Sequence, residues 1–240
     1  MKAVAYNKYG APDVLEITEK NKPELPADKI LVKVKASSVN PVDYKIRRGD
    51  MKALTGKIFP KLAGSDFAGV VEDKGSAVED FRKGDKVYGF MNPMKGGAYA
   101  EFIIVDPEKT ALMPDNLSFE EAASMPVAAL TALQALSYLG NVKEGTSVLI
   151  NGATGGVGSF AVQIAKALGA EVTGLCSGKN MEFCKKLGAD NVFDYSKDGL
   201  AGSGKKFDVF FDAAAKTNFS KSKMYLKKRG IYITTIPTFN

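Results

Sequence analysis

Two patterns of apolar residues divide the chain. Up to about Pro114 the apolar positions come in short, often alternating runs, as in residues 29–35, 69–72 and 102–105. Alternation with a period of two is typical of half-buried β-strands. Glycine and proline recur between these runs and supply turns at short intervals. This half of the chain is therefore expected to form a mostly β domain that folds on itself as a partly open barrel.

The second pattern begins near Ser118, which is followed three residues later by Glu121 in the arrangement of a helix capping box. Alanine-rich segments then predict linking helices over residues 118–139. Beyond them strands and helices alternate. The expected strands are 147–151, 171–176, 191–195, 207–212 and 231–235, and the expected helices are 157–168, 180–187 and 221–228. This alternation predicts a doubly wound, parallel α/β sheet of the Rossmann type, with domains at residues 1–115 and 116–240.

A glycine-rich loop joins the buried strand at 148–150 to an amphipathic helix, and four glycines fall within residues 152–158. In this context the loop resembles the dinucleotide fingerprint G-x-G-x-x-G, with a small residue at its first position. Such glycines let backbone approach a pyrophosphate, and the helix N-terminus attracts the anion. A tight turn without a ligand is the alternative. The candidate cofactor-binding residues here are Ala153, Thr154, Gly155, Gly156, Val157 and Gly158.

The identity of the nucleotide is expected to depend on the end of the next strand, where an acidic residue would bind the ribose of NAD. No acid stands there. Ser177 and Lys179 offer a hydroxyl and an ammonium to a 2′-phosphate, and Tyr195 ends the third strand. Lys179 could equally be a solvated loop lysine. These residues favour NADPH over NADH.

Composition excludes several kinds of chemistry. The chain contains no histidine, which removes a Ser-His-Asp triad and any histidine base, and its two cysteines cannot build a common zinc site. The net charge of +6 comes from scattered lysines and only four arginines, so no nucleic-acid partner is expected. No apolar run approaches a membrane span or a secretory signal, and we expect a cytoplasmic protein.

Four further segments, at residues 39–49, 64–71, 82–89 and 126–132, carry a resemblance that covers essentially the whole chain. With the glycine loop, they resemble the zinc-independent quinone oxidoreductases, including zeta-crystallin, of the medium-chain dehydrogenase/reductase superfamily. Zinc-dependent relatives have a cysteine at the place of Asn40 and Gly-His-Glu at that of residues 64–66. The resemblance implies a GroES-like β domain, a Rossmann domain, an active site in the cleft between them, and often a homodimer.

Carried over by position, the resemblance places Asn40 and Asp43 near the nicotinamide, with Tyr44 as a candidate proton donor. The family's tyrosine stands one position later, where this chain has Lys45. Asn40 could instead cap a turn, Asp43 could cap a helix, and Tyr44 could be a core aromatic. Further cofactor contacts implied by the family are Thr131, Ala213, Ala214, Thr235 and Ile236.

These features predict hydride transfer from NADPH to a small-molecule quinone or α,β-unsaturated carbonyl, whose oxyanion needs only hydrogen bonds and a proton. The alternatives are an NADPH-binding sensor or structural protein without turnover, and an enoyl-thioester reductase. The sequence stops at Asn240, just after the expected fifth strand. We expect a shortened form with an unpaired sheet edge and a weakened homodimer.

Overall fold

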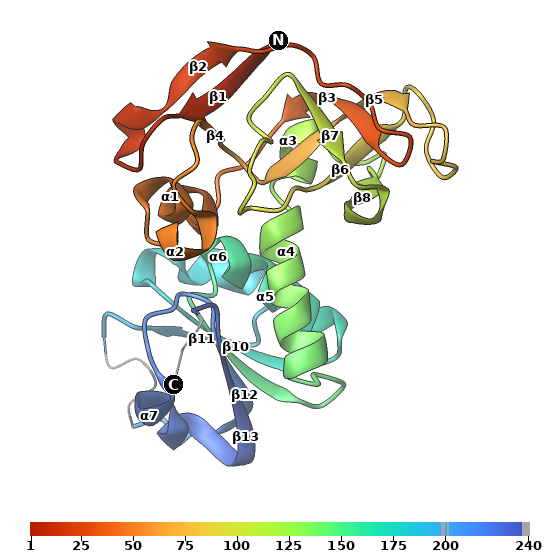
Figure 1. Ribbon diagram of the computed structural model, residues 1–240. Helices are drawn as coiled ribbons and strands as arrows, with labels where there is room; N and C mark the ends of the chain where they lie inside the picture. The colour runs from red at the N-terminus through yellow and green to blue at the C-terminus, as the bar shows by residue number, and fades with distance from the viewer. Residues whose placement is uncertain (198–199, 201, 237–240) are drawn as a thin grey trace. The chain divides into compact units, whose positions relative to one another are not determined.

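The computed structural model describes residues 1–197, 200 and 202–236. Its contacts divide the chain into two compact units, Met1–Val127 and Ala128–Asn240 (Figure 1). Each unit has its own core and is described by itself. The domain boundary after residue 115 stays a prediction.

The first unit is built from two antiparallel sheets. The smaller has the order β2-β1-β4, and the larger has the order β7-β3-β5-β6-β8. The strands are β1 (Lys2–Tyr6), β2 (Glu16–Glu19), β3 (Ile30–Ala36), β4 (Lys61–Leu62), β5 (Asp66–Lys74), β6 (Lys86–Phe90), β7 (Phe102–Val105) and β8 (Thr110–Leu112). Their inward positions, among them Ile30, Val32, Phe67 and Val87, are fully buried. The expected alternating strands are thus present.

Short helices connect these strands. They are η1 (Pro12–Val14), α1 (Pro41–Arg48), α2 (Lys52–Thr55), η2 (Pro107–Lys109) and α3 (Phe119–Ala123). The capping box expected at Ser118 is present: its hydroxyl accepts the Glu121 N–H at 3.2 Å, and the Glu121 carboxylate accepts the Ser118 N–H at 2.8 Å. These two bonds satisfy amides at the start of α3 that have no partner within the helix.

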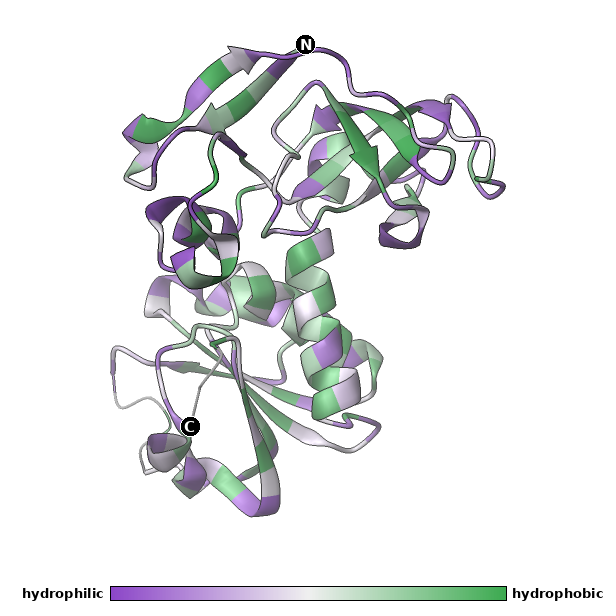
Figure 2. Cartoon of the chain, in the orientation of Figure 1, coloured by the Kyte–Doolittle hydropathy of each residue, from purple (hydrophilic) through white to green (hydrophobic). Residues whose placement is uncertain are grey.

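The second unit contains a parallel five-stranded sheet in the order β11-β10-β9-β12-β13. The strands are β9 (Ser147–Asn151), β10 (Glu171–Cys176), β11 (Asn191–Asp194), β12 (Phe207–Asp212) and β13 (Leu226–Thr234). Val148, Leu149 and Ile150 of β9 are fully buried. Val148 and Ile150 pack in one hydrophobic cluster with helix α5, which lies against the sheet (Figure 2), and Leu149 packs in a second cluster, so both faces of the strand are covered. This strand order is that of a doubly wound Rossmann sheet, and the predicted fold class is confirmed.

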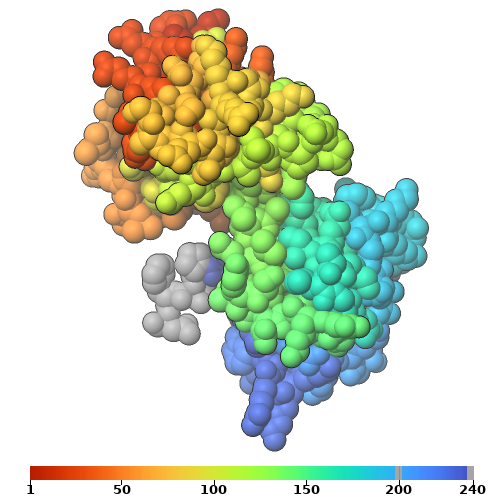
Figure 3. Space-filling model, turned by 90° about the vertical axis from the view of Figure 1, so that its right-hand side faces the viewer, coloured from red at the N-terminus to blue at the C-terminus, as the bar shows by residue number. Residues whose placement is uncertain are grey.

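The helices of this unit follow the predicted alternation with one exception. They are α4 (Pro126–Leu133), the π-helix η3 (Gln134–Leu139), α5 (Gly156–Ala167), η4 (Gly178–Asn180), α6 (Met181–Lys186), α7 (Phe219–Ser222) and η5 (Lys223–Tyr225). Several apolar side chains of α4 and η3, such as Tyr138 and Leu139, are exposed; this segment is green in Figure 3.

The exception is the helix expected over residues 221–228, which is only partly present: residues 221–225 lie in α7 and η5, and residues 226–228 belong to β13. Asn218 caps the short helix α7 through a hydrogen bond from the Lys221 N–H, and the helix ends at Ser222. Leu226 already pairs with Phe207 of β12. Lysines and a leucine have good helix propensity, but pairing with a distant strand overrides that local preference here.

In the part of the chain that the structure describes, no helix is long and apolar enough to cross a membrane.

Candidate functional site

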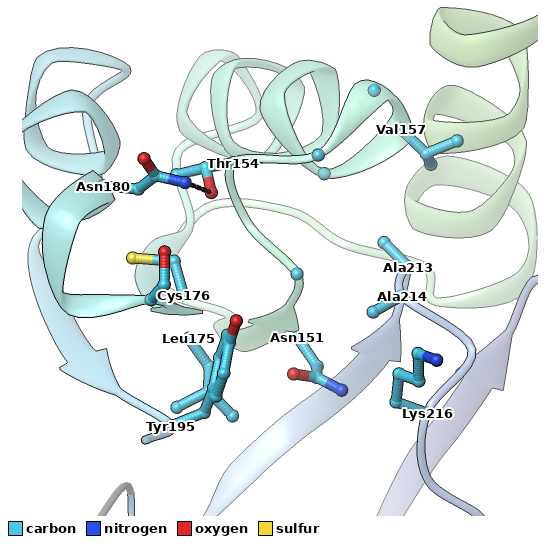
Figure 4. A pocket seen from close by; sticks show the side chains of 15 residues that line it. Asn151, Thr154, Val157, Leu175, Cys176, Asn180, Tyr195, Ala213, Ala214 and Lys216 are labelled. Carbon is cyan, nitrogen blue, oxygen red and sulfur yellow. Dashed lines mark hydrogen bonds between the residues drawn. The ribbon is translucent and has the colours of Figure 1, made fainter. Parts of the chain in front are cut away.

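A pocket of about 630 Å³ lies at the carboxyl ends of β9, β10 and β12 (Figure 4). β9 is flanked by β10 on one side and β12 on the other, so the chain changes direction across the sheet at this point. Parallel sheets bind ligands at such switch points, and the volume is that of a small-molecule site. The lining residues are Asn151, Gly152, Thr154, Gly155, Gly156, Val157, Gly158, Leu175, Cys176, Ser177, Asn180, Tyr195, Ala213, Ala214 and Lys216.

The glycine loop forms one wall of this pocket, and its geometry accounts for its glycines. Gly152 has a φ of 76°, in the left-handed region that glycine adopts without strain. A Cβ atom on Gly158 would lie 2.0 Å from the Gly152 carbonyl oxygen, so helix α5 approaches the loop as closely as backbone allows. At Gly156 a Cβ would meet nothing within 4 Å. Gly158 therefore allows helix α5 to pack closely against the loop, whereas the space beside Gly156 is open.

The N-terminus of α5 faces the pocket from this loop. Gly155 is the N-cap residue, and the first turn of the twelve-residue helix contains no acidic side chain. The first amides of a helix lack partners within it and carry partial positive charge. An anionic group such as a pyrophosphate fits this wall, because Gly155 and Gly156 carry no side chain and a Cβ on Gly156 would meet nothing within 4 Å.

Polar side chains gather at the end of the pocket beside β10 and β11. The Asn180 amide donates to Thr154 Oγ1 at 3.2 Å (Figure 4). Ser177, which follows β10, and Tyr195, which follows β11, also line the pocket. None of the fifteen lining residues is acidic. Asp194 and Asp212 each precede a lining residue but lie outside the lining set. Hydrogen bonds from Ser196 lower the pKa of the Asp194 carboxyl group. Hydroxyl and amide donors without a carboxylate suit a phosphate better than a bare ribose.

The structure brings nine of the predicted cofactor residues together around the pocket: Thr154, Gly155, Gly156, Val157, Gly158, Ser177, Tyr195, Ala213 and Ala214. The others do not line it. Ala153 is fully buried, Lys179 is an exposed residue of η4, and Thr131 lies on α4. Thr235 and Ile236 follow the end of β13. Cofactor contacts by these five residues stay predictions.

Sequence reasoning missed the pocket residues Asn151, Asn180 and Lys216. Asn151 ends strand β9, and its position at the carboxyl end of a buried strand could have indicated it. Asn180 stands one position after Lys179, in the same turn for which the sequence predicts a polar contact to the cofactor. Lys216 lies beyond β12 in a loop that carries no motif.

The residues predicted to act in catalysis lie in the first unit, around helix α1. Asn40 is the N-cap residue of α1 and is only 7% exposed. Its side-chain amide donates to Asp66 Oδ2 at 2.8 Å and to Ser38 Oγ at 3.1 Å. Both hydrogens of that amide are therefore used within the protein.

Asp43, the third residue of α1, ties the start of the helix to its surroundings. Its Oδ2 accepts the Asn40 N–H at 2.7 Å and the Tyr99 hydroxyl at 3.4 Å, and its Oδ1 accepts the Ser65 hydroxyl. It thus caps the helix from position N3. Tyr44 is 41% exposed rather than a core residue, and it borders a small cavity of about 100 Å³ with Val39 and Tyr99.

Asp66 is the most deeply buried acid of this polar cluster and is fully inaccessible to solvent. Burial raises the pKa of its carboxyl group to about 6, against the opposing effect of hydrogen bonds from Asn40, Ser38 and the Val127 N–H. Burial also raises the pKa of the Tyr99 phenol, and the nearby Asp43 carboxylate adds to that effect. Neither Asp66 nor Tyr99 was singled out by the sequence.

Two family models match the chain. Residues 26–115 match the alcohol dehydrogenase GroES-like domain, and residues 156–235 match the zinc-binding dehydrogenase family. A spinach (Spinacia oleracea) quinone-oxidoreductase homolog of the chloroplast is 39% identical over 247 residues, which cover 99% of this chain and 75% of the relative. The chain belongs to the quinone oxidoreductase branch of the medium-chain dehydrogenase/reductase superfamily.

Two other members of this superfamily are informative about chemistry. An NADPH-dependent alkenal/one oxidoreductase from Arabidopsis thaliana is 40% identical over 223 residues, covering 89% of this chain and 57% of that protein. The structure of Escherichia coli quinone oxidoreductase complexed with NADPH matches with a TM-score of 0.86 and 29% identity, over 98% of this chain and 72% of that one. The family predicted from the sequence motifs is confirmed.

The family model of the second unit is named after zinc, so the potential metal ligands matter. Among the residues that the structure describes, no group of three or more histidine, cysteine, aspartate or glutamate side chains could hold a metal ion. Cys176 and Cys184 are both buried, and burial raises the pKa of both thiols, that of Cys184 to about 12. A neutral, buried thiol is a poor metal ligand.

Proposed function

We propose that the protein is an NADPH-dependent oxidoreductase that reduces quinones or α,β-unsaturated carbonyl compounds without a metal ion. The observation that supports this most directly is the pocket of the second unit. A glycine-lined helix N-terminus forms one of its walls, and hydroxyl and amide donors stand at one end with no lining carboxylate. These features suit the pyrophosphate and the 2′-phosphate of NADPH.

The glycine loop gives a physical test of whether the cofactor fits. A cofactor phosphate needs backbone amides that side chains do not screen, and Gly155 and Gly156 leave that space free, with only the Gly152 oxygen within 4 Å of a Cβ on Gly155. When bound, NADPH supplies a hydride, and the reduced acceptor takes up one proton. The chain's own part is to hold the phosphates, orient the dinucleotide along the strand ends, and exclude water from the pocket.

In the first unit, we assign Asn40 and Asp43 to positioning rather than to proton transfer. Their side chains are held by Asp66, Ser38, Ser65 and Tyr99, so they order the start of α1. Tyr44 is the better proposal for a proton donor, because its ring is accessible from solvent. An acceptor without a metal ligand can be reduced when hydrogen bonds and a phenol or water stabilise its oxyanion.

The function is tested by following NADPH oxidation with three acceptors: a benzoquinone, a 2-alkenal and an enoyl-CoA. A simple alcohol is tested in the reverse direction, by following NADP⁺ reduction. We expect acceptor-dependent oxidation with the quinone or the alkenal and none with the alcohol. NADPH binding without turnover of any acceptor would instead favour a sensor or structural protein. Turnover confined to enoyl-CoA would identify an enoyl-thioester reductase.

The proton donor is tested by Tyr44→Phe, with Tyr138→Phe as the matched control on the exposed surface of η3. We expect Tyr44→Phe to lower kcat roughly tenfold or more and to leave NADPH affinity unchanged, since general acid catalysis contributes factors of about 10² to 10⁴. Equal kcat in the two variants would exclude Tyr44 as the proton donor. The homodimer, the absence of a nucleic-acid partner and the cytoplasmic location stay predictions.

A further inference from the structure

Lys216 is the one charged side chain among the fifteen residues that line the pocket of the second unit. Within the described part of the chain, no carboxylate lies at ion-pair distance from its ammonium group. A cation without a protein partner at the edge of an otherwise uncharged pocket attracts an anionic ligand. This observation is independent of the glycine loop, because Lys216 follows a different strand, β12.

The backbone that carries Lys216 is fixed by a buried acid. Asp212 is fully inaccessible; its Oδ2 accepts the Thr217 N–H at 2.9 Å and its Oδ1 accepts the Asn151 amide at 2.8 Å. The Ala214 N–H donates to the Asn151 carbonyl oxygen at 3.2 Å. These hydrogen bonds therefore connect the residues on either side of Lys216 to Asn151, directly from Ala214 and through Asp212 from Thr217. Asn151 ends β9, the strand that leads into the glycine loop.

Ala215 within this turn has a φ of 55°, in the left-handed region that is unfavourable for residues with a Cβ. Such strain persists where the surroundings determine the backbone completely, and it is common beside functional sites. Here the Asp212 hydrogen bonds determine it. They fix the backbone around Lys216, whose exposed side chain lines the pocket.

Lys216 is far from the group of donors assigned to the 2′-phosphate. Figure 4 shows Lys216 and Tyr195 on opposite sides of Asn151, with Lys216 beside Ala214. NADPH carries anionic groups at two places, the 2′-phosphate and the pyrophosphate. Because Ser177, Asn180 and Tyr195 occupy the other end of the pocket, the pyrophosphate is the cofactor anion that remains for the end lined by Lys216.

On these grounds, and resting on the proposed function, we propose that Lys216 binds the cofactor's pyrophosphate, at the phosphate on the nicotinamide side, and is held there by Asp212. The glycine loop and α5 then contact the pyrophosphate from one side and the lysine contacts it from the β12 side. Such a contact strengthens binding of NADPH and NADH equally, so it sets affinity and leaves the choice between them to the other end of the pocket.

The test uses Lys216→Gln, Lys216→Arg and the control Lys221→Gln, which removes an exposed lysine of α7 that does not line the pocket. Dissociation constants are measured for NADPH, NADH, ADP-ribose and 2′,5′-ADP. ADP-ribose contains the pyrophosphate but no 2′-phosphate, whereas 2′,5′-ADP lacks the phosphate on the nicotinamide side. The two probes therefore separate the two anionic positions.

We expect Lys216→Gln to weaken NADPH, NADH and ADP-ribose by about tenfold each, as loss of a charge-assisted hydrogen bond does, with 2′,5′-ADP changed less than about twofold. Lys216→Arg should restore most of the affinity, and Lys221→Gln should match the wild type. A loss confined to NADPH and 2′,5′-ADP would place Lys216 at the 2′-phosphate and overturn the proposal. Unchanged affinities in Lys216→Gln would overturn it too, and so would an equal loss in Lys221→Gln. If the wild-type protein binds none of the four nucleotides, the proposed function fails together with this inference.

Discussion

Replacing Gly158 by alanine should destabilise the second unit and weaken the cofactor site together. The new Cβ would lie 2.0 Å from the Gly152 carbonyl oxygen, 2.8 Å from its carbon and 3.0 Å from Ala153 Cα, all of them backbone atoms. A contact of 3.0 Å is the least that real Cβ atoms show, so helix and loop must separate by about 1 Å. Overpacking of this kind costs about 3 kcal/mol, partly offset by about 1 kcal/mol from alanine's better helix propensity.

The net loss of about 2 kcal/mol is measured by urea unfolding of the cofactor-free protein, where it should lower the midpoint by roughly 1 M. Two neighbouring glycines provide matched controls. Gly156→Ala meets nothing within 4 Å and should be neutral or stabilising by about 0.5–1 kcal/mol. Gly155→Ala meets only the Gly152 oxygen, at 3.3 Å, so it should leave apo stability nearly unchanged.

The affinity for NADPH distinguishes these glycine variants in a second way. Gly155→Ala should weaken NADPH despite its normal stability, because its Cβ enters the space assigned to the pyrophosphate. Gly158→Ala should weaken NADPH by displacing the loop. If Gly158→Ala proves as stable as the wild type, or Gly156→Ala proves the most damaging in the apo protein, the packing argument for this loop is refuted.

Further variants test other parts of the molecule. Ser177→Asp should lower NADPH affinity at least tenfold relative to NADH, because it adds an acid at the end assigned to the 2′-phosphate; an unchanged preference would contradict that assignment. The pKa of the Asp66 carboxyl group is raised to about 6 in the folded state, so the folded protein binds this proton more tightly than the unfolded chain does. As the pH rises from 4 to 6, Asp66 should therefore lower the free energy of unfolding by up to about 3 kcal/mol. The wild-type stability minus that of Asp66→Asn should decrease across this window, and a difference that rises with pH would refute the sign. Cys176 and Cys184 should resist a thiol reagent in the native protein and react after denaturation; rapid native reaction of either would contradict their burial.

The Rossmann unit could be predicted because its signals are local. The buried strand β9, the glycine loop and helix α5 follow one another directly, and each has a pattern that requires no knowledge of distant partners. The helix expected at residues 221–228 ends early, at residue 225, for the opposite reason. Its residues favour a helix locally, but Leu226 pairs with Phe207 of β12. A contact between residues so far apart in the sequence cannot be predicted from a local pattern.

The candidate site shows the same division. Glycines 155, 156 and 158 and the donor Ser177 could be found from a spacing rule, because the rule reflects the geometry of a strand, a turn and a helix. Lys216 could not, since its place depends on hydrogen bonds that the Asp212 carboxylate accepts from Asn151 and Thr217. The packing of Asn40 against Asp66 was equally hidden, because 26 residues separate them in the sequence.

The central claim is that the pocket at the ends of β9, β10 and β12 binds NADPH and discriminates it from NADH. The most direct measurement is a titration of the 240-residue protein with each dinucleotide, followed by the fluorescence of the dihydronicotinamide. We expect NADPH to bind at least tenfold more tightly than NADH, as the donors Ser177, Asn180 and Tyr195 require. Equal affinities would contradict the assignment of those donors to the 2′-phosphate, and no binding of either dinucleotide would contradict the proposed function itself.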